Sequence, residues 1–213
     1  MSKRDRLDGF SGLFRPALAL LCSLALLGGL AGCAPRDRAV GDSWRQGVSA
    51  EHDGPDRSAV LVAVIGPANA ERDSRWQDLS RRLFQSLERA GMHAYYAPAW
   101  DQAGQEQGVR DAVARRVSLI AVERPGAGDW SRSLILARNK GVPVVVLDGG
   151  QEPGDTTLYA ARVDIDEGSP SARPLPSVLQ TIADDRQHAR RLVANLNDEP
   201  TQRTSPDQME AKQ

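Results

Sequence analysis

The 213-residue sequence is short of cysteine and histidine and carries little net charge, and each shortage excludes a class of protein. Its two cysteines, Cys22 and Cys33, lie near the N-terminus, so the body of the chain has no disulfide framework and no cysteine-ligated metal site. His52, His93 and His188 are scattered without a metal-ligand spacing. A net charge of −1 gives no electrostatic argument for a nucleic-acid partner. We expect neither a metal nor another cofactor.

Long apolar runs are also scarce, and the longest precedes Cys33. A basic start leads into an apolar segment over about 17–30, which ends in Leu30-Ala31-Gly32-Cys33. This order resembles a bacterial lipoprotein signal, in which small residues admit the peptidase and the cysteine receives the lipid. The segment is short for a permanent span and contains two glycines near its end. We predict a signal peptide over 1–32 and a lipid, such as palmitate, on Cys33; an uncleaved membrane anchor is the alternative.

Removal of 32 of the 213 residues leaves 181, enough for one domain of ordinary size. Residues 33–57 are polar and charged and predict a flexible tether. Residues 58–196 hold the apolar patterning and predict the domain. Residues 197–213 contain almost no large apolar side chain and predict a disordered tail.

Apolar runs and amphipathic segments alternate between the tether and the tail. The runs predict strands over 59–65, 93–98, 117–122, 142–147 and, with a more alternating pattern, 158–165. The amphipathic segments predict helices from Trp76 toward Gly91 and over 105–116, 130–139 and 176–196. This strict alternation predicts an α/β fold with a doubly wound, mostly parallel sheet. We expect the fifth strand near an edge of the sheet or at a crossover out of it.

Ligands bind such sheets at the carboxyl ends of the strands, so the loops after the strands are the candidate sites. No catalytic constellation or phosphate-binding motif lies there, and we expect no enzyme. The glycines at 126 and 128 could cradle an anion, but Asp129 as a cap of the following helix is the better account. Glu123 and Arg124 could contact a ligand or form a surface ion pair, and we favour the ion pair.

Several of these segments resemble the type I periplasmic binding proteins, which include ribose-binding-like receptors and the ligand domains of LacI-type repressors. The resemblance covers about residues 59–166. The segments that carry it are Leu61–Pro67, Arg75–Gln77, Asp101–Val109, Val117–Val122 and Ala137–Asp148.

The resemblance implies that Trp76 stacks on a sugar-like ligand and that Asp148 accepts hydrogen bonds from its hydroxyls, with Asn69 and Asp101 in neighbouring loops. Trp76 equally fits the apolar stripe of its helix, and Asp148 equally fits a turn. Gly149 stands where sugar-binding members commonly carry arginine. The chain has room for about one of the family's two lobes, and 163–166 looks like the crossing into the second lobe.

Together these features predict a lipid-anchored extracytoplasmic protein, in the periplasm or at the cell surface, that binds or senses a small sugar-like solute. It would be an accessory to a transporter or a membrane sensor. The alternative is a non-catalytic docking scaffold that has lost ligand binding. Its partner would be another protein or a second copy that supplies the missing lobe.

Overall fold

The computed structural model describes residues 37–44, 56–67 and 74–197, with the backbone alone for 74–76. The chain divides into two compact units, Met1–Cys33 and Ala34–Gln213, and every described residue belongs to the second unit. Its elements are η2 (Arg57–Ala59), β1 (Leu61–Ile65), α2 (Ser74–Arg89), β2 (His93–Ala97), α3 (Gln102–Ala114), β3 (Leu119–Glu123), α4 (Ser131–Asn139), β4 (Val144–Leu147), β5 (Ala161–Ile165), β6 (Arg173–Pro174), α5 (Leu175–Ala183) and β7 (Arg191–Asn195).

The described strands form one sheet of seven strands in the order β2-β1-β3-β4-β5-β7-β6. Every neighbouring pair is parallel. Strand β1 pairs with β2 on one side and with β3 on the other, so the direction of winding reverses between β1 and β3. This is the switch point of a doubly wound α/β fold, and the predicted fold class is confirmed.

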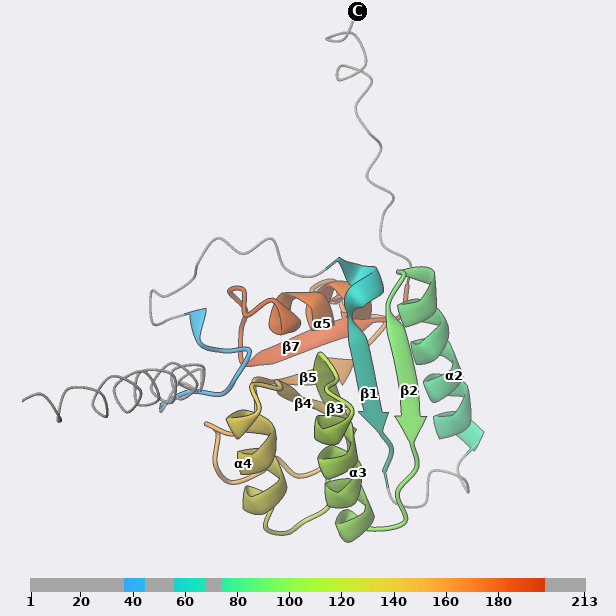
Figure 1. The fold of residues 1–213 in the computed structure, drawn as a ribbon. Coiled ribbons are helices and arrows are strands. Elements are labelled where there is room, and N and C mark those ends of the chain that lie inside the picture. The colour runs from blue at the N-terminus through green and yellow to red at the C-terminus, as the bar shows by residue number, and fades with distance from the viewer. Residues whose placement is uncertain (1–36, 45–55, 68–73, 198–213) are drawn as a thin grey trace, which may run out of the picture. The chain divides into compact units, whose positions relative to one another are not determined.

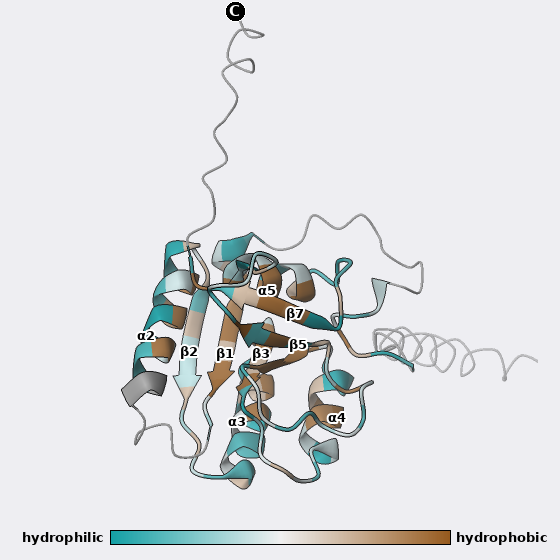
Figure 2. Ribbon diagram, turned by 180° about the vertical axis from the view of Figure 1, so that it is seen from behind, coloured by the Kyte–Doolittle hydropathy of each residue, from teal (hydrophilic) through white to brown (hydrophobic). Residues whose placement is uncertain are grey.

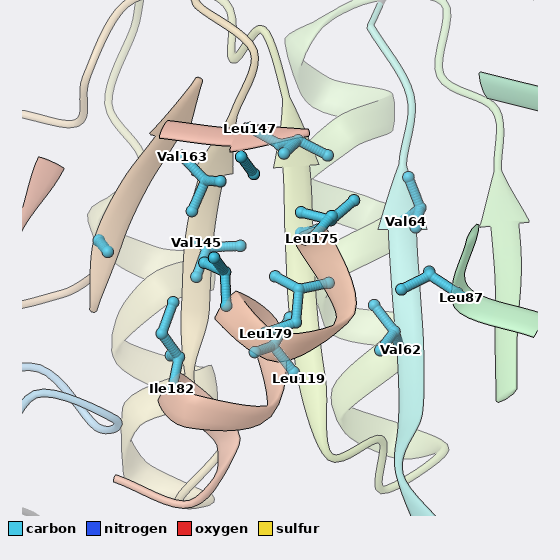
Figure 3. Packing of buried hydrophobic residues seen from close by; sticks show 14 of the residues in the cluster. Val62, Val64, Leu87, Leu119, Val145, Leu147, Val163, Leu175, Leu179 and Ile182 are labelled. Carbon is cyan, nitrogen blue, oxygen red and sulfur yellow. The ribbon is translucent and has the colours of Figure 1, made fainter. Parts of the chain in front are cut away.

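Each face of the central strands is covered by two helices (Figure 1). Val62 and Val64 of β1 pack in one apolar cluster with residues of α2 and α5, whereas Ala63 and Ile65 pack in another with residues of α3 and α4. Figure 3 shows how side chains of α5 interleave with valines and leucines of the strands in the first cluster. Burial on both faces explains why β1 is a continuous apolar run, which is brown in Figure 2.

Strand β5 lies inside the sheet, between β4 and β7, and the predicted position near an edge or a crossover is wrong. Ala161 and Val163 are buried, while Arg162 and Asp164 on the opposite face are half-buried. The alternating pattern of apolar and polar residues therefore indicates a strand that is buried on one face and only half-buried on the other. After β5 the chain continues through β6 and α5 into β7 of the same sheet, so 163–166 is not a crossing into a second lobe.

The predicted helix over 176–196 is too long. Helix α5 ends at Ala183, where the N–H of Arg186 donates to the carbonyl of Thr181 at 2.9 Å and Asp185 has a φ of 52°. Residues 191–195 then form β7, which pairs with β5. The apolar residues of β7 fit a helical and an extended pattern equally, so periodicity alone could not choose between them.

Residues 37–44, which we call the strap, pack on the domain. Ala39 is 1% exposed and belongs to the core cluster that contains α5. Gly41 has a φ of 86°, and a Cβ at this position would lie 2.9 Å from the Ile182 carbonyl oxygen and from the Pro143 Cβ. Only glycine fits there.

The prediction of a flexible tether over 33–57 is therefore wrong for the eight residues of the strap. Residues 33–36 and 45–55 of that segment lie outside the described residues, as do the predicted signal peptide and all but residue 197 of the predicted tail.

Candidate functional site

A buried glutamine of α3 occupies the switch point between β1 and β3. The Gln105 Nε2 donates to the carbonyl of Gly66 at 3.2 Å and to the carbonyl of Glu123 at 2.9 Å. Its Oε1 accepts from the N–H of Gly126 at 3.1 Å. One side chain therefore pairs backbone groups at the ends of both strands, where a ligand of a doubly wound sheet would contact them. In the sequence Gln105 marked only the start of a predicted helix.

Glu123, the last residue of β3, carries a fully buried carboxyl group without a partner. Its exposure is 0%, and neither carboxyl oxygen has a hydrogen-bond donor among the described residues. The predicted surface ion pair with Arg124 is wrong, because β3 is a central strand and its end is covered. Arg124 itself is exposed.

The surroundings of Glu123 favour its protonated form. Burial raises the pKa of this carboxyl well above its ordinary value, and the negative charge of Asp148 raises it further, while Arg124 lowers it by less. A protonated carboxyl donates one hydrogen bond and accepts others. The folded state thus favours a neutral carboxyl group at this position, and the described residues leave its hydrogen-bonding capacity unused.

Asp148 follows β4 at the same edge of the sheet. The register pairs Glu123 of β3 with Leu147 of β4, so Asp148 stands one position beyond that pair. Its N–H donates to the carbonyl of Val163 at 2.8 Å, and its side chain is half-buried. The chain bends at residues 148–150, and Asp148 and Gly149 both have positive φ. Two carboxyl groups therefore converge at the ends of neighbouring strands.

The loops after β3 and β4 hold each other in an uncommon backbone conformation. Arg124 and Asp148 have φ values of 42° and 51°, in the left-handed region that residues other than glycine rarely adopt. A Cβ on Gly150 would lie 2.6 Å from the Arg124 Cα, and the N–H of Gln151 donates to the carbonyl of Pro125 at 3.2 Å. Strained backbone of this kind clusters at binding sites.

An exposed tryptophan follows β2 at the carboxyl edge. Trp100 is 67% exposed, whereas the other tryptophan in a described loop, Trp130, is 3% exposed. The adjacent Asp101 caps α3, because its Oδ1 accepts from the N–H of Gly104 at 2.8 Å. Trp100 was not among the predicted site residues. Its position outside both the strand run and the helical stripe was the available signal that it faces solvent.

The glycines between β3 and α4 form no open anion cradle. The side chain of Gln102 fills the space where Gly128 would carry a Cβ, and the Trp130 Nε1 donates to the carbonyl of Gly126 at 2.9 Å. Asp129 accepts from the N–H of Ser131 at 2.9 Å, as a helix cap does, although Trp130 is the residue directly before α4.

Several predicted sites are only partly placed. Trp76 lies in the first turn of α2, where the structure describes the backbone alone, and Asn69 and Cys33 lie outside the described residues.

In the described ranges no group of histidine, cysteine, aspartate and glutamate side chains could hold a metal ion. No helix within those ranges is both long enough and apolar enough to cross a membrane.

No protein-family model and no curated protein sequence matches the chain. Solved structures do match it, among them a galactofuranose binding protein, at 24% identity and a TM-score of 0.46, over 50% of this chain and 36% of that one. The arabinose-transporter binding protein of Shewanella sp. ANA-3 matches at 21% identity and 0.46, over 50% and 35%. A Mycobacterium smegmatis protein in complex with β-D-fucofuranose matches at 16% identity and 0.45, over 65% and 57%.

The first two are sugar-binding proteins, the class that the sequence resemblance predicted. The matched region spans about half of this chain for the first two, and in all three it is less than two thirds of the other protein's length.

Proposed function

We propose that this chain is a lipid-anchored extracytoplasmic protein that binds a small polar solute at the carboxyl ends of β3 and β4, as a non-catalytic accessory to transport or sensing. Cys33 carries the lipid. The solute has sugar-like chemistry, with hydroxyl groups that pair with the carboxyl groups of Glu123 and Asp148. The observation that carries this proposal is the buried Glu123 carboxyl group, which has no hydrogen-bond partner among the described residues.

A buried polar group without a partner destabilises a fold, by about 1–3 kcal/mol in mutational data. An apolar residue at the end of β3 would avoid this cost, so the carboxyl group is better explained by a ligand than by folding. Its position supports the same conclusion, because parallel α/β sheets bind ligands at the carboxyl ends of their strands. The solute would supply the missing hydrogen-bond partner.

Trp100 supports a sugar-like solute. A sugar ring combines an apolar face with a rim of hydroxyl groups, so its sites pair an aromatic ring with carboxyl or amide groups. Trp100 offers an exposed aromatic ring on the edge that carries Glu123 and Asp148. Trp76, together with Asn69 and Asp101, completes the set of candidate contacts.

Because the Glu123 side chain is fully buried, the solute reaches it only when the loops after β3 and β4 separate. Both loops contain residues with positive φ that the closed arrangement holds in place. Separation would release that strain and uncover both carboxyl groups, so binding and loop movement are coupled in this proposal.

The test is a thermal-shift screen of the unit Ala34–Gln213 against sugars, polyols, nucleosides and amino acids. A ligand of the folded state raises its stability by about 2.7 kcal/mol at a hundredfold excess over the dissociation constant. We expect one class of polar solute to respond, and Asp148→Ala and Glu123→Gln to lose the response. Asp129→Ala is the matched control, because it removes an exposed carboxyl group from the same edge. An unaltered response in both site variants would refute the site.

The docking scaffold remains a second candidate, and Gln105 favours it. Its amide already pairs the backbone groups at the switch point, so the position where a doubly wound sheet binds ligands is closed. A protein that melts cooperatively and responds to no solute in the screen would support the scaffold over solute binding.

A further inference from the structure

The strap is fixed to the domain by hydrogen bonds and an ion pair at its C-terminal half. The N–H of Ser43 donates to the Asp185 Oδ1 at 2.7 Å, and the Ser43 hydroxyl donates to the other oxygen of the same carboxylate. The Arg190 Nη1 donates to the Asp42 Oδ2 at 3.1 Å, and Asp42 is 1% exposed. Such a set of contacts holds a defined docked position rather than a loose association.

The contacts of the strap lie at the amino edge of the sheet. The Nε2 of His188 lies 2.6 Å from the carbonyl oxygen of Gly41, and both His188 and Arg190 precede β7. Pro143 precedes β4, and Ile182 lies in the last turn of α5. Figure 1 shows the strap, in blue, beside the start of β7. In a parallel sheet the amino ends share one edge, so the strap lies opposite the edge with Glu123 and Asp148.

The strap begins only four Cα-to-Cα steps after Cys33, at Asp37. A fully extended chain spans at most about 3.6 Å per residue, so these steps reach about 14 Å in any conformation. A free tether over 33–57 would reach several times farther. A lipid on Cys33 therefore keeps the strap, and the edge to which it is docked, close to the lipid headgroups.

Two exposed cations flank the docked strap. Lys140 directly follows α4, three residues before Pro143, and Arg186 follows Asp185 and forms an ion pair with Asp184 at 3.4 Å. Basic side chains near a membrane are attracted to anionic headgroups. We propose that the strap fixes the amino edge of the sheet against an anionic lipid surface, so that the carboxyl edge faces away from the membrane. This inference rests on the lipid anchor of the proposed function.

The experiment uses the lipidated chain, reconstituted in vesicles of phosphatidylcholine and phosphatidylglycerol that contain some lipid with a nitroxide on its headgroup. With Cys33 lipidated and Cys22 removed with the signal peptide, Asn139→Cys or Ala127→Cys introduces the only free thiol for a fluorophore. Both positions are exposed; Asn139 is the last residue of α4, and Ala127 lies four residues before the first residue of the same helix. We expect quenching at residue 139 to exceed quenching at residue 127 at least twofold.

Two insertions test whether the docked strap causes the difference in quenching between the two labelled positions. A flexible insertion of about 20 residues between Ala34 and Asp37 lengthens the reach before the strap, and we expect it to remove the difference between the two labels. The same insertion between Gly47 and Val48 lies after the strap and should leave the difference intact. Gly41→Val, whose side chain cannot fit beside Ile182, should act like the first insertion.

Equal quenching of both labels in the chain without insertions would overturn the orientation. So would a difference that survives the insertion before the strap. Failure of the lipidated chain to float with the vesicles would refute the anchor and this inference together. Solute binding is measured on the unit Ala34–Gln213 without lipid, so its outcome stays separate.

Discussion

Two buried carboxyl groups at opposite edges of the sheet have contrasting surroundings. Asp42 in the strap is 1% exposed, and its Oδ2 accepts from the Arg190 guanidinium at 3.1 Å, while its Oδ1 has no hydrogen-bond partner among the described residues. Glu123 at the end of β3 is 0% exposed and has no hydrogen-bond donor among the described residues. Both would be costly to bury alone, because an ionised carboxylate loses its hydration.

The difference indicates two roles. Asp42 is paired with a cation that also donates to the Thr156 carbonyl at 2.8 Å and stacks on the Tyr159 ring at 4.9 Å, so its burial serves the docking of the strap. No described residue pairs with the Glu123 carboxyl group, and its burial lowers the stability of the fold. A buried group that the fold does not satisfy points to something outside the fold, which here is the proposed solute.

Arg190→Ala should have the largest effect, because it leaves the buried carboxyl group of Asp42 without its cation. Removal of one partner from a fully buried pair costs about 3–5 kcal/mol, and we expect about 2 kcal/mol here because the Arg190 side chain is 32% exposed. Urea denaturation measures this loss. Arg81→Ala is the control, since it removes an ion pair with Asp78 in which the two side chains are 65% and 66% exposed. Equal losses in the two variants would show that the Asp42 pair is not special.

Gly150→Ala tests whether the two loops beside Glu123 are locked together. A Cβ there would lie 2.6 Å from the Arg124 Cα, so we expect a loss of roughly 2 kcal/mol in the free energy of unfolding. Gly149→Ala is the matched control, because Gly149 also has positive φ but a Cβ there would meet nothing within 4 Å. The excess loss at Gly150 over Gly149 measures the clash alone, and no excess would mean that the loops are free to adjust.

Glu123→Gln should change how stability depends on pH. The raised pKa in the folded state means that the contribution of Glu123 is fully present below its unfolded pKa and is lost as pH rises through its folded pKa. Each unit of that difference is worth about 1.4 kcal/mol. We expect the glutamine variant to lack this decline and to be more stable than the unaltered protein at pH 8, but not at pH 4.

Asp148→Asn sharpens this pH test. The charge of Asp148 raises the pKa of Glu123, so its removal should reduce the decline in stability and end it at a lower pH. Chemical denaturation at a series of pH values measures both variants. An identical pH profile in all three proteins would contradict the described surroundings of Glu123.

Trp100→Ala should have the smallest effect on stability, within about 0.5 kcal/mol, because the side chain is 67% exposed. In contrast, it should weaken the response to the solute identified in the screen. Thermal unfolding with and without that solute measures both quantities. A large loss of stability, or a full solute response, would remove Trp100 from the site.

The sequence predicted the alternating strands and helices well, because residues such as Val62 and Leu119 lie in runs that are buried on both faces. It failed where local pattern and tertiary packing disagree. Leu192 fits a helical stripe, yet it pairs with Val163 in the sheet. The polar strap looked like a tether, because its docking depends on His188 and Arg190, about 150 residues away in the chain.

The site was only partly predictable for the same reason. Asp148 could be found from its place after an apolar strand, and it lies at the carboxyl edge as expected. Glu123 looked like a surface residue, since the sequence does not show that the loops after β3 and β4 cover each other. Gln105 was missed because three backbone groups from separate segments define its role.

We infer that the Glu123 carboxyl group serves solute binding and not the stability of the fold. The most direct test is a parallel measurement of unfolding free energy and solute affinity for the unaltered protein and Glu123→Gln at pH 8. We expect the variant to be more stable and to lose solute binding. A variant that binds the solute with unaltered affinity would contradict the account.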